Sequence, residues 1–131
     1  MKSLDGEAAI QRPLVAVVDD DESVRESLPD LLEEFGFSSK VFSSAEEFLA
    51  SDTVSQMNCL VLDVAMPGMT GFDLQQDLKV RGHKIPVIFI TAERDETVRK
   101  RALERGAVEL LFKPFSDTAL LRALNAALGL D

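Results

Sequence analysis

Residues 14–24 read LVAVVDDDESV, an apolar run that passes directly into three aspartates and a glutamate. Residues 14–18 are apolar at every position, which predicts a strand buried on both faces, as the strands of parallel sheets are. Carboxylates a few ångströms apart repel one another, so such a cluster costs stability unless a cation neutralises it. The stretch therefore predicts a parallel sheet with a cation-dependent site where its first strand ends.

Short apolar runs alternate with longer amphipathic segments along the rest of the chain. Helical spacing and capping residues predict helices, and uninterrupted apolar runs predict buried strands. Pro29 falls inside the first helix, where we expect a kink or an early break. Strands are expected at 14–18, 40–42, 58–62, 86–90 and 108–112, and helices at 24–35, 44–49, 71–78, 95–105 and 117–128. This alternation predicts an α/β fold, a doubly wound five-stranded parallel sheet with five helices.

Polar side chains follow four of the predicted strands. Asp19 and Asp20 end the first, Asp63 the third, Thr91 the fourth and Lys113 the fifth. Each is ordinary alone, but in doubly wound sheets ligands bind at the carboxyl ends of the strands. Carboxylate oxygens ligate Mg²⁺, and Lys and Thr bind phosphoryl oxygens. The set predicts a site for a divalent cation and a phosphoryl group.

Composition narrows the partners of this chain. Its 131 residues suit one domain, and 23 acidic against 14 basic residues give a net charge of -9. There is no Trp or Tyr to stack on bases. A phosphate backbone would repel this surface, so we expect no direct binding to nucleic acid. No G-x-G-x-x-G occurs, so a dinucleotide is not indicated either.

The remaining sequence features indicate a cytoplasmic protein. Residues 1–12 have no periodicity and predict a mobile N-terminal tail, which carries acids and no apolar core of a signal peptide. No run approaches the roughly 20 apolar residues of a membrane span. The one cysteine, Cys59, lies in an apolar run, which favours a buried inert thiol and a reducing compartment.

Four motifs together indicate a family. They are Val-Val-Asp-Asp-Asp at 17–21, Leu-Asp-Val-Ala-Met-Pro-Gly-Met-Thr-Gly at 62–71, Ile-Thr-Ala at 90–92 and Lys-Pro-Phe at 113–115. With them, the chain resembles the receiver domains of bacterial two-component response regulators, most closely the FixJ-like subfamily. The resemblance implies a receiver domain over residues 13–131 with the flavodoxin-like strand order 2-1-3-4-5.

The resemblance also implies a role for each site residue. Asp63 would accept a phosphoryl group from the phosphohistidine of a sensor histidine kinase or phosphotransfer protein. Asp20, Asp63 and the backbone carbonyl of Ala65 would ligate Mg²⁺, with Asp19 acting through water. Lys113, expected before a cis proline, would pair with Asp63 until transfer, and Thr91 would then bind the phosphoryl group. Such a protein is a signalling phospho-acceptor that assists its own phosphorylation and dephosphorylation, not an enzyme.

Two positions depart from the pattern of the family. Leu110 replaces the aromatic residue that rotates with the switch threonine in many members, so we expect a backbone and helix shift instead. Glu93-Arg-Asp-Glu replaces a Gly-rich stretch. Because Thr91 leads into the charged helix at 95–105, we expect phosphorylation to promote a homodimer through residues 95–112.

Two alternatives remain at this point. The stretch Asp19-x-Asp21-x-Ser23 resembles the nucleophile motif of haloacid-dehalogenase-type phosphatases, although these need a further acidic pair, and only Asp117 and Asp131 follow Lys113. The other alternative is an interaction module of the same fold that works without phosphorylation. Steady turnover of a phosphomonoester would indicate the enzyme, and one stable phosphoryl group per chain the receiver.

Overall fold

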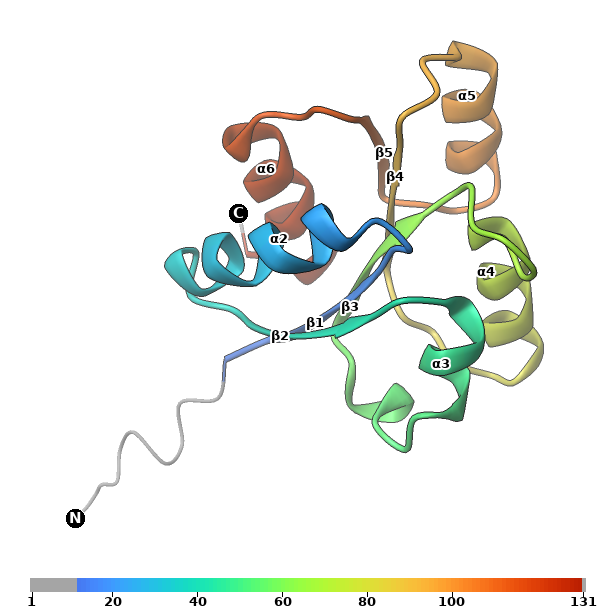
Figure 1. Cartoon of the computed structure of the whole chain (residues 1–131), viewed down its shortest axis with the longest axis horizontal. Coiled ribbons are helices and arrows are strands. Elements are labelled where there is room, and N and C mark those ends of the chain that lie inside the picture. The colour runs from blue at the N-terminus through green and yellow to red at the C-terminus, as the bar shows by residue number, and fades with distance from the viewer. Residues whose placement is uncertain (1–11, 131) are drawn as a thin grey trace.

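Five parallel strands form one sheet in the order β2-β1-β3-β4-β5 in the structure, a computed structural model that describes residues 12–130 (Figure 1). This confirms the predicted fold class and strand order. β2 begins two residues earlier than expected. The strands are β1 (Leu14–Val18), β2 (Ser38–Phe42), β3 (Cys59–Asp63), β4 (Val87–Thr91) and β5 (Glu109–Phe112).

The five expected helices are present, together with one short 3-10 helix that periodicity did not predict. They are α2 (Glu22–Glu34), α3 (Ala45–Ala50), η1 (Val54–Gln56), α4 (Gly71–Val80), α5 (Glu96–Glu104) and α6 (Asp117–Leu128). The side chain of the N-cap residue of each α-helix accepts a hydrogen bond from a backbone N–H of the first turn. These N-caps are Asp21, Ser44, Thr70, Asp95 and Ser116.

The sheet is covered on both faces, which is why its inner strands β1, β3 and β4 are largely apolar and buried, whereas the edge strand β2 is mostly polar and exposed. Successive residues of a strand point to opposite faces. Val15 and Val17 pack with α2 and α6, whereas Ala16 and Val18 pack with the helices of the other face. Figure 1 shows α2 and α6 on one side of the sheet and α3, α4 and α5 on the other. The two cores fix the sheet, and with it the ends of its strands.

Local details differ from expectation in two helices. An early break at Pro29 is wrong, because α2 continues to Glu34, and Leu28 and Leu32 on either side of the proline are buried and hold the helix on the sheet. A kink at Pro29 stays a prediction. Helical spacing predicts that Leu103 of α5 points inward together with Val98 and Ala102, but Leu103 is 39% exposed, so this prediction is wrong. The predicted tail at 1–12 lies outside the described residues except for Arg12. Among residues 12–130, no helix is long and apolar enough to cross a membrane.

The expectation for Cys59 is confirmed. Its side chain is fully buried, and burial raises the pKa of the thiol to about 12. It is therefore a core residue and no candidate for the site.

Candidate functional site

The structure brings the five predicted strand-end residues to one edge of the sheet. All strands are parallel, so their carboxyl ends share that edge. Asp19 is fully buried, and Asp63 and Thr91 are 5% and 2% exposed. Asp20 is exposed, and the side chain of Lys113 is mostly buried. Burying a polar side chain costs free energy. Three of them buried together at strand ends, Asp19, Asp63 and Thr91, therefore mark a functional site better than any motif alone.

Lys113 lies between the carboxylates of Asp19 and Asp63 and is closer to that of Asp19. Its Nζ is 2.8 Å from Oδ2 of Asp19 and 4.0 Å from Oδ1 of Asp63. The expected contact of Lys113 with Asp63 is present, but the further expectation that Asp63 is the carboxylate nearest to Lys113 is wrong, because Asp19 is nearer. Burial works against the charge of Lys113, but the two aspartates outweigh it and raise the pKa of the ammonium. Lys113 stays charged, and it is shared between them.

Asp19, Asp20 and Asp63 are arranged as a cation site would require. Each offers a carboxylate oxygen, and these oxygens lie within 4.8 Å of one another. Burial, followed by the nearby charge of Asp19, raises the pKa of Asp63 to about 7, although Lys113 and the N–H of Ala65 act to lower it. A hard divalent cation takes oxygen ligands and would remove this repulsion, so the three carboxylates fit Mg²⁺.

The backbone around Asp63 is tightly built. The N–H of Ala65 donates to Oδ1 of Asp63 at 3.3 Å. At Gly71, the first residue of α4, a Cβ atom would lie 2.3 Å from the backbone oxygen of Asp63. Only glycine lets α4 start this close to the strand end. The predicted use of the Ala65 carbonyl as a metal ligand stays a prediction.

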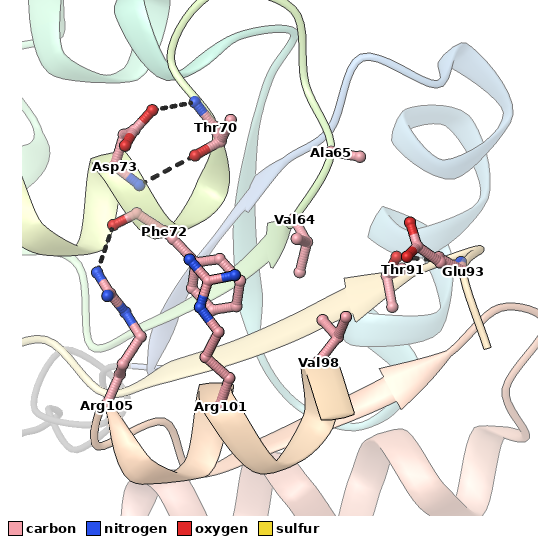
Figure 2. Close-up of a pocket in the computed structure, with 10 residues that line it drawn as sticks. All are labelled: Val64, Ala65, Thr70, Phe72, Asp73, Thr91, Glu93, Val98, Arg101 and Arg105. Atoms are coloured by element: carbon pink, nitrogen blue, oxygen red, sulfur yellow. Dashed lines mark hydrogen bonds between the residues drawn. The ribbon is translucent and has the colours of Figure 1, made fainter. Parts of the chain in front are cut away.

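Thr91 borders a hollow of about 380 Å³ between α4 and α5 (Figure 2). Its hydroxyl oxygen accepts a hydrogen bond from the N–H of Glu93 at 3.1 Å. Val64, Ala65 and Val98 give the hollow an apolar side. The Thr91 side chain thus has one hydrogen-bond partner on its own loop and open space beside it.

Sequence reasoning missed the contacts that join α4 and α5. The guanidinium carbons of Arg101 and Arg105 lie 4.8 and 5.1 Å from the centre of the Phe72 ring, and Arg105 donates to the backbone oxygen of Phe72 at 3.3 Å (Figure 2). It also missed Arg25, which donates to the backbone oxygen of Asp19 at 2.9 Å. No spacing rule marks these arginines, because the contacts join residues brought together by the fold.

Comparison with known proteins agrees with this geometry. A family model described as a response regulator receiver domain matches residues 15–125. The response regulator protein TodT of Pseudomonas putida is 43% identical over 89% of this chain and 52% of its own length. Transcriptional regulatory protein FixJ of Azorhizobium caulinodans is 41% identical over 88% of this chain and 54% of its own. The chain therefore spans about half the length of these relatives.

Solved structures give the same result. The crystal structure of FixJ-N matches with a TM-score of 0.80 and 38% identity, covering 92% of this chain and 96% of that one. The response regulator StyR matches with a TM-score of 0.83 and 47% identity, over 92% of this chain and 61% of StyR. The similarity therefore extends over both sequence and fold.

Proposed function

Because the chain belongs to the response regulator receiver domain family, we propose that Asp63 accepts a phosphoryl group from the phosphohistidine of a sensor histidine kinase or phosphotransfer protein. The observation that carries the proposal is the position of this carboxylate. Asp63 is buried at a strand end, beside a second aspartate and 4.0 Å from the ammonium of Lys113. The family does not favour the phosphatase alternative.

The proposed step is a substitution at phosphorus. A carboxylate oxygen of Asp63 forms a bond to phosphorus while the bond from phosphorus to the imidazole nitrogen breaks, and the imidazole leaves. Lys113, shared with Asp19 before transfer, neutralises the phosphoryl oxygens as they approach. Asp19, Asp20, Asp63 and the carbonyl of Ala65 would hold Mg²⁺, which supplies charge neutralisation and orientation when bound. The domain acts as a signalling phospho-acceptor that also assists loss of its phosphoryl group.

Thr91 is proposed to couple phosphorylation to the surface of the molecule. Its hydroxyl would leave the N–H of Glu93 and bind the phosphoryl group, with the hollow beside it allowing the loop to follow. That loop leads into α5, which with β5 carries the proposed dimer surface at 95–112. Arg99 on α5 and Glu109 on β5 pair at 2.8 Å, so the two elements would move together.

The proposal extends to the boundaries and setting of the domain. The receiver would occupy residues 13–131 after a tail at 1–12, and would regulate an output without binding nucleic acid itself, because its net charge is -9. A buried unpaired cysteine suits a reducing, cytoplasmic setting.

Intact mass spectrometry tests the proposal with acetyl phosphate as the donor. The wild type should gain one phosphoryl group with Mg²⁺ present and much less without it. Asp63→Asn should gain none, and Asp20→Asn, altered at an exposed residue, should gain it slowly. Unchanged labelling of Asp63→Asn would refute the proposal, and continuous release of phosphate without a labelled chain would indicate the enzyme instead.

A further inference from the structure

A side chain of α2 holds the turn that carries two of the proposed metal ligands. Nη1 of Arg25 donates to the backbone oxygen of Asp19 at 2.9 Å. The same turn is held by two other bonds, from the N–H of Asp19 to the backbone oxygen of Phe42 at 3.1 Å and from the N–H of Asp21 to Oδ1 of Asp19 at 2.9 Å. Arg25 is the only side chain among residues 12–130 for which a bond to this oxygen is found.

The bond matters because of the peptide unit it holds. The carbonyl of Asp19 and the N–H of Asp20 belong to one planar unit, so fixing the oxygen fixes the direction in which the chain enters Asp20. Asp19 itself is fully buried and paired with Lys113. Asp20 is exposed, and no protein group was found to bind its carboxylate within the described part of the chain. Its placement therefore depends on its backbone.

Arg25 is well suited to this task and poorly explained otherwise. Its backbone N–H bonds to the oxygen of Asp21, so the base of the side chain is fixed by the first turn of α2. A cation near a helix N-terminus is disfavoured by the helix dipole. The guanidinium of Arg25 makes a charge-assisted hydrogen bond to the carbonyl of Asp19. Arginine forms such a bond through a rigid, planar donor group.

We propose that Arg25 is a positioning residue for the cation site, which orients the Asp19–Asp20 peptide so that the Asp20 carboxylate meets those of Asp19 and Asp63. This rests on the proposed function of the site as a Mg²⁺ site. Two effects of Arg25 oppose each other: its positive charge repels a cation, and its hydrogen bond organises the ligands. The effect of the hydrogen bond is the larger of the two. Loss of Arg25 therefore weakens Mg²⁺ binding although a positive charge is removed.

Calorimetric titration of the unphosphorylated protein with Mg²⁺ separates the two effects. Arg25→Met, which removes both the charge and the donor, should raise the Kd about three- to ten-fold. Arg25→Lys keeps the charge and should recover only part of the affinity. Arg122→Met is the matched control, because Arg122 is an exposed arginine on α6, and it should leave the Kd unchanged.

A second readout needs no metal. The amide of Asp21, which donates to Oδ1 of Asp19 at 2.9 Å, should exchange with solvent several-fold faster in metal-free Arg25→Met, whereas amides in β1 should not change. An unchanged or lower Kd in Arg25→Met, with an unchanged exchange rate of the Asp21 amide, would overturn the inference. If Arg25→Met unfolds, Arg25→Lys decides by the same two measurements. Failure of the wild type to bind Mg²⁺ would instead overturn the proposed function, so the two failures are distinguishable.

Discussion

At the residue scale, Asp63 is a carboxyl group whose ionisation the fold disfavours. Burial and the neighbouring Asp19 raise its pKa to about 7 from an ordinary value of 3.8. Between roughly pH 4 and pH 7 the folded state therefore holds a proton that the unfolded state has lost. The contribution of Asp63 to the free energy of unfolding accordingly falls as the pH rises through this window.

We expect this to appear as a pH-dependent difference between the wild type and Asp63→Asn without metal. Between pH 5 and pH 8, the variant should gain about 1 to 3 kcal/mol in free energy of unfolding relative to the wild type. Urea titrations at the two pH values measure it. A difference between the two proteins that does not change with pH would show that the fold does not raise the pKa of Asp63.

Gly71 is the residue for which a small change should have the largest structural effect. A Cβ atom there would lie 2.3 Å from the backbone oxygen of Asp63, so α4 or the strand end must shift. We expect Gly71→Ala to lower the free energy of unfolding by about 2 to 4 kcal/mol. Gly36→Ala is the control: Gly36 has a φ of 94° but open space around it, so only about 1 kcal/mol should be lost. Equal losses, measured by urea titration, would contradict the steric argument.

The site residues could be predicted from the sequence because parallel strands bring their ends to one edge. Asp19, Asp63, Thr91 and Lys113 lie together for that reason. Their pairing could not be predicted, because a difference of 2.8 against 4.0 Å from Lys113 depends on side-chain packing and not on strand order. The bond from Arg25 to the backbone oxygen of Asp19 could not be predicted for the same reason.

At the element scale, two helices differ from expectation in opposite directions. α2 continues past the expected early break, and α5 is less buried than expected. α2 runs through Pro29 because its apolar face is buried on the sheet, and tertiary packing offsets a lost hydrogen bond. α5 buries only Ala102 completely, and its expected inner residue Leu103 is partly exposed. Strand and helix positions followed from periodicity, but the depth at which each helix is buried did not.

Contacts with α4 compensate for the shallow packing of α5. The backbone oxygen of Arg105 accepts from Lys79 at 2.7 Å and from Gln75 at 3.3 Å, while its guanidinium faces the Phe72 ring. We expect Arg105→Met to increase amide hydrogen exchange in α5 by roughly two- to ten-fold, as loss of about 0.5 to 1.5 kcal/mol implies. Exchange in α6 should stay unchanged. Equal exchange of α5 in the variant and the wild type would show that this side chain does not hold the helix.

At the scale of the whole molecule, the carboxylate cluster should link stability to Mg²⁺. A ligand that binds only the folded state stabilises it by mass action, by about 2.7 kcal/mol at a concentration 100 times its Kd. Millimolar Mg²⁺ should raise the Tm of the wild type by several degrees and that of Asp20→Asn by much less, as calorimetry would show. An unchanged Tm in the wild type would contradict the proposed cation site.

Pairing of two molecules is the expected outcome of phosphorylation. A charge-assisted hydrogen bond from Thr91 contributes roughly 1.5 to 3 kcal/mol, whereas shifting a population from 1:99 to 99:1 needs about 5.5. Thr91 alone is therefore not sufficient, and we expect Lys113 to add to the shift. We expect phosphorylated wild type to dimerise and phosphorylated Thr91→Val to remain monomeric in light scattering. Equal masses would remove Thr91 from the switch.

Direct localisation of the phosphoryl group tests the central claim, that Asp63 is the acceptor. The protein is phosphorylated with acetyl phosphate and Mg²⁺, reduced with borohydride, which converts an aspartyl phosphate to homoserine, and sequenced by mass spectrometry. We expect homoserine at position 63 and at neither Asp19 nor Asp20. Homoserine at Asp19, the carboxylate 2.8 Å from Lys113, with aspartate retained at 63, would contradict it.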